Sequence, residues 1–298
     1  MVYDIIIIGG GPAGLTAAIY ARRANKSVLV MEKGSFGGQI TSSPKVENIP
    51  GFISVSGNEF ADMLLSQATE LGAEVECIEV LSFEDGEVKK VITDEGDFFA
   101  RSVIIATGTK HRLLGLPREE DFIGNGISFC AVCDGAFYTG KTVAVIGGGN
   151  SALQEAILLS ENCEKVYIIQ NLDFFTGEEK LAEEIKNISN ITPIMGAVPV
   201  ELLGEDEIAG IKIQKGGVTE EIKLDGIFTA IGLVPQNDIF ASVIKLNDYG
   251  YVDADESCLT SSEGIFVAGD CRSKRIRQVA TAASDGAVAA LAACDYLK

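Results

Sequence analysis

Two cysteines and an acid stand together in the sequence CAVCDG, and their types and spacing fit redox chemistry. Cys130 and Cys133 are three positions apart, which permits a disulfide across the first turn of a helix, where the helix N-terminus stabilises a thiolate. When the disulfide is reduced, one sulfur must take up a proton. The adjacent Asp134 is the best proton donor and acceptor, because the chain's one histidine, His111, has no acid or cysteine close to it in sequence. We expect His111 at the surface or supporting a loop.

A zinc half-site is the alternative for this cysteine pair. A structural zinc site needs four ligands, and the sequence has neither a second CxxC nor a pair of histidines. The other cysteines occur singly, and we expect small buried apolar residues at these positions, with the role of Cys271 left open: Cys77, Cys163, Cys258, Cys271 and Cys294. The total of seven is odd and only one pair has a familiar spacing, which in a reducing compartment favours redox chemistry over structural bridges.

A nucleotide-binding pattern opens the chain. Residues 3–8 predict a buried strand, GGGPAG follows, and an alanine-rich helix continues to about Arg23 before a second strand over residues 27–31. The glycines permit a tight turn and close approach to a pyrophosphate at the helix N-terminus, and the acid after the second strand accepts from ribose hydroxyls. The predicted dinucleotide site comprises Gly9, Gly11, Pro12, Ala13, Gly14 and Glu32. A simple glycine-rich turn is the alternative.

The same pattern recurs in the middle of the chain. A strand over residues 142–146 precedes GGGNSA, and another strand covers residues 165–169. In this second copy Ala152 stands in place of Gly14, and Gln170 in place of Glu32. The second copy therefore lacks the acid.

Two apolar segments that end in glycine, residues 104–108 and 228–232, mark where the chain crosses between domains. We expect one domain of residues 1–115 and 233–298, with a second domain of residues 116–232 inserted into it. Because both halves carry the strand, glycine turn and helix pattern, the predicted fold class is α/β with two Rossmann-like nucleotide-binding domains.

Composition and charge limit the partners. The 298 residues are 47% hydrophobic and carry a net charge of -19, which argues against nucleic-acid binding. No uninterrupted apolar segment reaches the roughly 18–20 residues that span a bilayer, and the N-terminus lacks the basic lead of a signal peptide. We expect a cytoplasmic protein that binds no membrane.

The ordered series GGGPAG, GGQ, VEN, ATG, CAVCDG, GGGNSA, VAGD and RQVATAA resembles the low-molecular-weight thioredoxin reductases over essentially the whole chain. The resemblance implies a homodimeric flavoprotein of the glutathione-reductase type, with FAD in the discontinuous domain and thioredoxin as substrate. It also implies that Cys133 faces the flavin, that Cys130 attacks the partner disulfide, and that domain rotation alternates access.

The resemblance further implies a set of FAD contacts. Asp270 contacts the ribityl chain, and the RQV segment of residues 277–279 lies by the flavin ring. The predicted cofactor-binding residues beyond the dinucleotide turn are Lys33, Gly38, Gln39, Asn48, Thr107, Gly108, Gly269, Asp270, Arg277, Gln278 and Val279.

The electron donor is where the sequence departs from the family. NADPH-dependent members carry a histidine and three arginines in an HRRxxFR pattern, and this chain has Gln170, Asn171, Leu172 and Thr176 at the corresponding positions. Because a 2′-phosphate requires cationic partners, we expect no NADPH binding. For NADH, the chain lacks the acid that usually binds the free ribose, because Gln170 occupies that position. The alternative is a moved loop that supplies Lys165 or Lys180.

Without a nicotinamide donor, the chain resembles the ferredoxin-dependent flavin thioredoxin reductases. Flavin suits this role because it connects one-electron and two-electron carriers. Ferredoxins are acidic, so we predict a docking patch at Arg272, Lys274 and Arg275, with an ordinary solvated charge run as the alternative. A function of another class is a flavin-bearing redox sensor that does not turn over.

Overall fold

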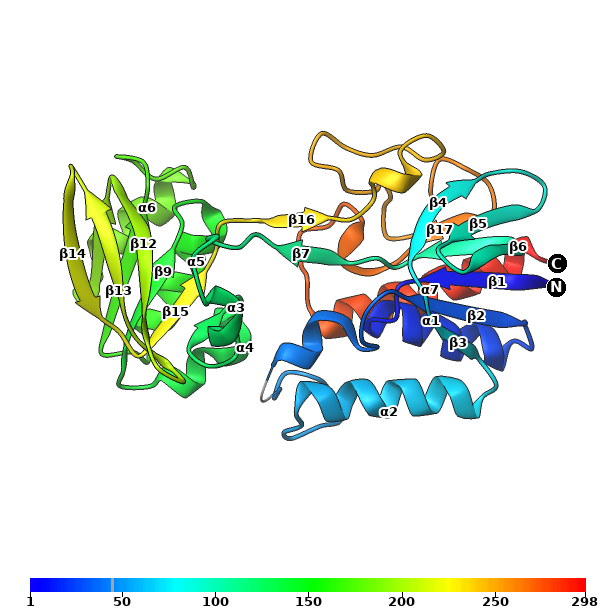
Figure 1. The fold of residues 1–298 in the computed structure, drawn as a ribbon, viewed down its shortest axis with the longest axis horizontal. Coiled ribbons are helices and arrows are strands. Elements are labelled where there is room, and N and C mark those ends of the chain that lie inside the picture. Colours follow the sequence, from blue (N-terminus) through cyan, green and yellow to red (C-terminus); the bar gives the residue numbers. More distant parts are fainter. Residues whose placement is uncertain (44–45) are drawn as a thin grey trace. The chain divides into compact units, whose positions relative to one another are not determined.

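The computed structural model describes residues 1–43 and 46–298, and the chain forms two compact units. Unit 1 comprises Met1–Lys110 and Val234–Lys298, and unit 2 comprises His111–Leu233. The sequence predicts the first crossing after residue 115 and the return at residue 233. The two crossing segments pair as strands β7 (Thr109–His111) and β16 (Leu233–Pro235) (Figure 1). Unit 2 is therefore an insertion into unit 1.

Unit 1 is built on a mostly parallel sheet in the order β3-β2-β1-β6-β5-β4, with β17 beside β6. Strands β1, β2, β3, β6 and β17 pair in parallel, and β4 and β5 form an antiparallel extension. The strands are β1 (Val2–Ile8), β2 (Val28–Glu32), β3 (Glu74–Cys77), β4 (Val80–Glu84), β5 (Lys89–Thr93), β6 (Gly96–Ile105) and β17 (Ile265–Val267).

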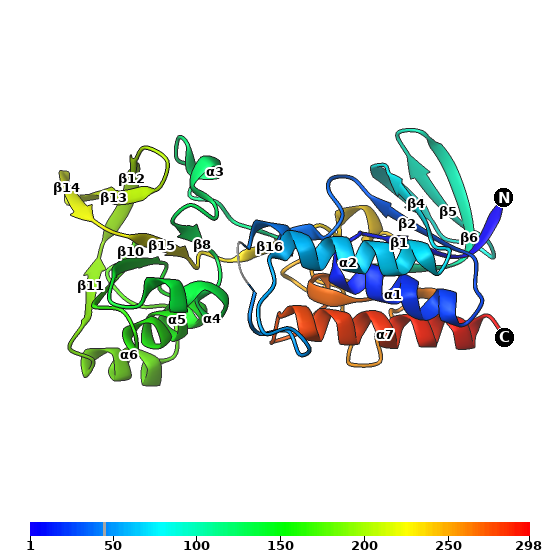
Figure 2. The ribbon, with the colours of Figure 1, turned by 90° about the horizontal axis from the view of Figure 1, so that it is seen from below.

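Three long helices belong to unit 1: α1 (Pro12–Arg23), α2 (Gly57–Glu70) and α7 (Val279–Tyr296). Figure 2 shows α1 between α2 and α7. Strand β1 is apolar without alternation because both of its faces are covered. Ile5 and Ile7 pack into the core on the helix side, whereas Ile6 and Ile8 join the core on the opposite side.

Unit 2 repeats this plan with a parallel sheet in the order β11-β10-β9-β15-β8. Helix α5 and strands β9 and β10 repeat α1, β1 and β2, which confirms the predicted second copy. A three-stranded antiparallel sheet, β12-β13-β14, packs on the face of the parallel sheet opposite α5. The elements are α3 (Glu119–Phe122), β8 (Ile127–Ser128), α4 (Ala131–Asp134), β9 (Thr142–Ile146), α5 (Asn150–Ser160), β10 (Lys165–Gln170), α6 (Glu179–Lys186), β11 (Ile191–Met195), β12 (Ala197–Gly204), β13 (Ile208–Lys215), β14 (Val218–Lys223) and β15 (Gly226–Thr229).

Within the described residues, no helix has both the length and the apolar character needed to cross a bilayer. The longest, α7, has 18 residues and carries Asp285 among its buried side chains.

The close approach of α7 to α1 yields a stability prediction. A Cβ added to Gly286 would lie 2.2 Å from the carbonyl oxygen of Ala13, so Gly286→Ala must push the two helices apart. We expect it to lower the free energy of unfolding by about 1–3 kcal/mol in urea titrations. Ser284→Ala, at an exposed position of the same helix, should change it by less than about 0.5 kcal/mol. A stabilised Gly286→Ala variant, as helix propensity alone predicts, would contradict this packing.

Candidate active site

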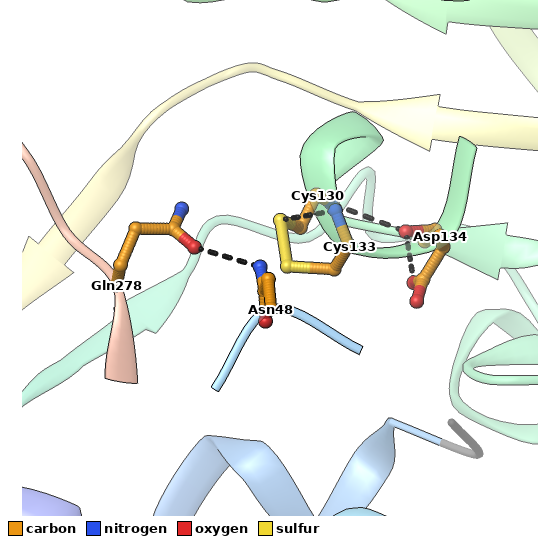
Figure 3. Close-up of a disulfide and its surroundings, with 6 residues drawn as sticks. Asn48, Cys130, Cys133, Asp134 and Gln278 are labelled. Atoms are coloured by element: carbon orange, nitrogen blue, oxygen red, sulfur yellow. Dashed lines mark hydrogen bonds between the residues drawn. A yellow bond between two sulfur atoms is a disulfide. The ribbon is translucent and has the colours of Figure 1, made fainter. Parts of the chain in front are cut away.

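Cys130 and Cys133 form a disulfide, with their Cα atoms 5.3 Å apart (Figure 3). Cys130 is the N-cap of α4, and the Cys133 backbone N–H donates to Cys130 Sγ over 3.2 Å. A hydrogen bond to sulfur favours the charged form of a thiol. This geometry therefore favours Cys130 as the thiolate once the disulfide is reduced.

Ser128 joins this centre, although sequence reasoning missed it. Its hydroxyl donates to Asp134 Oδ2 over 2.6 Å and accepts from the Cys130 backbone N–H over 3.1 Å. Asp134 Oδ1 is buried and has no hydrogen-bond partner within the described residues. Burial raises the pKa of Asp134 above its ordinary value, although the Ser128 hydrogen bond opposes the shift. Asp134 therefore retains its proton to a higher pH than an exposed aspartate. The available signal was a serine two positions before the first cysteine.

His111 supports the same loop. Its ring stacks on Phe129, the residue before Cys130, with centroids 4.2 Å apart and planes 15° apart. Burial lowers the pKa of His111 to about 4, so the imidazole is neutral at physiological pH. His111 is half-buried and not a surface residue.

The remaining cysteines differ in exposure. Cys163, Cys258 and Cys294 are buried as predicted. Cys271, whose role the sequence left open, is also buried, and its Sγ donates to the Ala268 carbonyl over 3.3 Å. The prediction was wrong for Cys77, which is exposed. Cys77 ends β3, the edge strand of the sheet, where one side of the strand is left without a neighbour.

The predicted cofactor residues of unit 1 gather at one edge of its sheet. Gly9 follows β1, Glu32 ends β2, Thr107 follows β6 and Gly269 follows β17, and parallel strands direct their carboxyl ends to the same edge. The Glu32 carboxylate accepts from the backbone N–H of Gly10 over 2.8 Å. It is thereby fixed beside the glycine turn.

Several predicted residues are bonded to one another. Asn48 Nδ2 donates to Gln278 Oε1 over 3.2 Å (Figure 3), and Gln278 caps α7, whose first residue is Val279. Arg277 Nε donates to the Asp270 carbonyl over 3.4 Å. These contacts connect the VEN, VAGD and RQV motifs within unit 1.

The other predicted residues lie in the same region with different partners. Gln39, which follows Gly38 in a 3₁₀ helix, donates to the Thr109 carbonyl just beyond Gly108. Lys33 is half-exposed and pairs with Glu79 over 3.7 Å. Asn237, which sequence reasoning missed, is fully buried and bonds Thr107 Oγ1 over 3.0 Å.

Unit 1 fits a dinucleotide cofactor on three structural observations. Helix α1 begins after Gly11 with no side-chain cap and no acid in its first turn, which leaves its N-terminal N–H groups for an anion. A Cβ added to Gly11 would have Gly37 O, 3.8 Å away, as its one neighbour within 4 Å, so the turn is open on that side. Asp270 Oδ1 is buried without a hydrogen-bond partner in the described chain, which suits a ligand hydroxyl.

Unit 2 has a cleft of about 610 Å³ at the equivalent sheet edge, along the turn of residues 147–149. Gln170 is buried there, its amide donating to the Phe174 carbonyl over 3.2 Å and accepting from the Asn171 N–H over 3.1 Å. Among the described residues that line the cleft, Arg112 is the only cation. Neither Lys165, which begins β10 at its far end, nor Lys180 lines it. The alternative of a moved lysine loop is therefore wrong for this structure.

The predicted ferredoxin patch is also wrong as a free cationic surface. The side chains of Arg272 and Lys274 are 2% and 4% exposed, and both pair with Asp285 of α7, over 2.9 and 2.8 Å. Arg275 alone of the three is exposed. A buried cation needs a buried anion as its partner. The sequence pattern did not indicate that Asp285 of α7 is that anion.

Comparison with known proteins decides the family. The family model described as pyridine nucleotide-disulphide oxidoreductase matches residues 3–286. The chain belongs to this family. It is 41% identical to the "34.2 kDa protein in rubredoxin operon" of Clostridium pasteurianum, over 99% of this chain and 97% of that protein. It is 38% identical to the thioredoxin reductase of Bacillus subtilis, over 100% of this chain and 95% of that protein.

A solved structure agrees with these relatives. The thioredoxin reductase from Streptococcus pyogenes superposes with a TM-score of 0.94 at 36% identity, covering 99% of this chain and 98% of that chain. The predicted α/β fold with two Rossmann-like domains is confirmed. The family consists of flavoproteins that use FAD, so this chain is a thioredoxin reductase-like flavin disulfide oxidoreductase.

Asp134 yields a prediction for pH dependence. Its pKa is raised in the folded protein, so its contribution to stability is complete below pH 3.8 and is lost as pH rises through the folded pKa. Asp134→Asn should therefore be more stable than the wild type at neutral pH, with the difference vanishing in acid. Reoxidation of the chemically reduced variant by a small disulfide should be about 10²-fold slower.

Stopped-flow kinetics and urea titrations across pH measure both effects. Glu161→Gln, which neutralises an exposed acid of unit 2, is the control and should change neither. An unchanged reoxidation rate in Asp134→Asn would exclude a proton-transfer role.

Proposed function

We propose that this protein is an FAD-dependent thioredoxin reductase whose Cys130–Cys133 pair passes electrons to thioredoxin. The observation that carries the proposal is the disulfide bonded through its backbone to Ser128 and Asp134, in a chain similar along its whole length to thioredoxin reductases. The homodimer and the cytoplasmic location remain predictions.

The chemistry requires FAD in unit 1. We propose that the turn of residues 9–14 holds the pyrophosphate, that Glu32 accepts from a ribose hydroxyl and that Asp270 accepts from the ribityl chain. We propose that the other FAD contacts are made by the cofactor-binding residues that the family resemblance predicts. When bound, FAD supplies two electrons to the disulfide and takes them up one at a time or together.

The dithiol of unit 2 then exchanges with thioredoxin. The Cys130 thiolate attacks one sulfur of the thioredoxin disulfide, which breaks that S–S bond and forms a mixed disulfide. The Cys133 sulfur attacks Cys130 Sγ, which restores the internal disulfide and releases the thioredoxin sulfur that Cys130 had attacked. Two electrons and two protons pass to thioredoxin, and Asp134 is placed to take up and return a proton.

Single cysteine variants test the two roles. Cys133→Ser should form a stable mixed disulfide with a thioredoxin that retains one activated active-site cysteine, because no second thiol remains to resolve it. Cys130→Ser should form the adduct at least about tenfold more slowly, since its remaining sulfur is not the one that accepts the helical N–H. Non-reducing gels follow the adduct, and Cys77→Ser added to Cys133→Ser is the control. Equal rates from the two single variants would contradict the assignment.

We propose reduced ferredoxin as the electron donor. The cleft of unit 2 offers Gln170, Asn171 and Leu172 where a 2′-phosphate needs cations. The Clostridium pasteurianum relative is named for a rubredoxin operon, and rubredoxins also carry single electrons. The docking surface cannot depend on Arg272 and Lys274, because both are buried.

A nicotinamide donor is the second candidate, favoured by one observation. The cleft is open beside an intact glycine turn, and Arg112 lines it. An arginine can pair with a phosphate group, so Arg112 is the residue through which a nicotinamide dinucleotide would bind.

The flavin's visible absorption distinguishes these donors. Anaerobically, reduced ferredoxin should bleach the band at least about 10²-fold faster than NADPH or NADH. The described lining of the cleft has only Arg112 as a cation for the 2′-phosphate of NADPH, and it has no acid for the free ribose of NADH. Arg112→Ala should leave the ferredoxin rate unchanged. Rapid bleaching by NADPH that Arg112→Ala slows about tenfold would establish the nicotinamide donor. A single stoichiometric reduction of thioredoxin, without turnover, would indicate the redox sensor.

A further inference from the structure

The carboxylate of Asp285 is the centre of a buried ionic cluster in unit 1. Its Oδ2 atom accepts from Arg272 Nε over 2.9 Å and from Lys274 Nζ over 2.8 Å, and its Oδ1 atom accepts from Arg272 over 3.0 Å. Arg272 also pairs with Glu256 over 3.0 Å. The Glu256 side chain is 90% exposed, so Asp285 is the buried acid that Arg272 and Lys274 share.

One further hydrogen bond connects this cluster to the backbone. The Gly269 N–H donates to Asp285 Oδ2 over 3.0 Å. Gly269 opens the 3₁₀ turn Gly269–Cys271, and its φ of +82° lies in the region that favours glycine. A Cβ there would lie 2.8 Å from the Cβ of Ala13 in α1. The turn therefore packs between the first turn of α1 and the Asp285 carboxylate.

The other end of this turn is fixed by a second buried side chain. Asn237 Nδ2 donates to the Cys271 carbonyl over 2.9 Å. Asp270 lies between the two anchored residues, and its Oδ1 atom is buried without a partner in the described residues. Burial raises the pKa of Asp270, although Lys274 and Arg277 oppose the shift. The structure therefore holds the backbone of this turn and leaves its carboxyl group for a ligand.

We propose that Asp285 is a positioning residue for the flavin site, which holds the Gly269–Cys271 turn so that Asp270 meets the cofactor. This inference rests on the proposed binding of FAD to unit 1. Arg272 and Lys274 serve it indirectly. Burial opposes ionisation of Asp285, but their hydrogen bonds hold its pKa below the ordinary value. The carboxylate therefore remains an acceptor for the Gly269 N–H.

The substitution Asp285→Glu separates positioning from charge balance. Glutamate keeps the negative charge between the two cations, but its extra methylene moves the oxygen that accepts from Gly269. Asp285→Asn removes the charge and leaves two buried cations underpaired, which endangers folding. Lys274→Met removes one donor while keeping Asp285 in contact with Gly269 and Arg272. Asp295→Glu, an exposed acid of the same helix, is the matched control.

The experiment is a fluorescence titration of purified apoprotein with FAD, combined with the visible spectrum of the bound flavin and the unfolding midpoint of the apoprotein. Asp285→Glu should raise the Kd for FAD at least about tenfold and shift the flavin absorption band, while its unfolding midpoint falls less than that of Asp285→Asn, which also loses the charge. Lys274→Met should raise the Kd about two- to threefold because one hydrogen bond to Asp285 is lost, and Asp295→Glu should match the wild type.

The outcomes separate this inference from the proposed function. A wild-type apoprotein that does not bind FAD overturns both. Wild-type binding with an unchanged Kd and spectrum in Asp285→Glu overturns the positioning role alone. A lowered unfolding midpoint with unchanged flavin properties assigns Asp285 to stability only. If Asp285→Glu does not fold, an unchanged Kd in Lys274→Met overturns the inference.

Discussion

The parallel alignment of strands in both units is the constraint on which the rest of the structure depends. In a parallel sheet the carboxyl ends of adjacent strands lie at one edge, and the loops that follow them must meet there. Gly9, Glu32, Thr107 and Gly269 come from four strands far apart in the chain, yet they reach the same edge of unit 1. The cleft along residues 147–149 is the corresponding edge of unit 2.

Three aspartates with buried carboxyl oxygens show how the surroundings of a carboxyl group decide its use. Asp285 has two cations and a backbone N–H as partners, so it is a structural anion. Asp134 has one oxygen bonded to Ser128 and the other without a partner in the described residues, which suits a group that gains and loses a proton. Asp270 has a buried oxygen without a hydrogen-bond partner in the described residues, which suits ligand binding.

The two copies of the nucleotide unit have the same framework and different chemistry. Glu32 is bonded to the glycine turn and keeps further acceptor capacity, whereas the Gln170 amide is bonded to its own loop. The helix and strand packing that builds a glycine turn does not depend on the residue that ends the second strand. One copy can therefore retain a cofactor site while the other changes its ligand or loses it.

The sequence alone predicted the features that depend on residues close together in the chain. The strand, glycine turn and helix pattern recurs within short segments, and the spacing of Cys130 and Cys133 fixes a disulfide within one turn. Local geometry and hydrophobic patterning are sufficient for these. The same reasoning placed Cys77 in the core and Arg272 and Lys274 at the surface, and both predictions were wrong.

Only the tertiary structure decided the exposure and the partners of those side chains. Whether a strand lies at the edge of its sheet depends on the order of all the strands, and this order left Cys77 exposed on β3. Asn237 reaches Thr107, and Asp285 reaches Gly269, because packing brings together segments that are separate in the chain. A charge pattern records the residue types, but burial sets whether a cation faces solvent or an acid. The sequence determined the redox pair and the nucleotide fold, and the packing of α7 determined what the basic segment does.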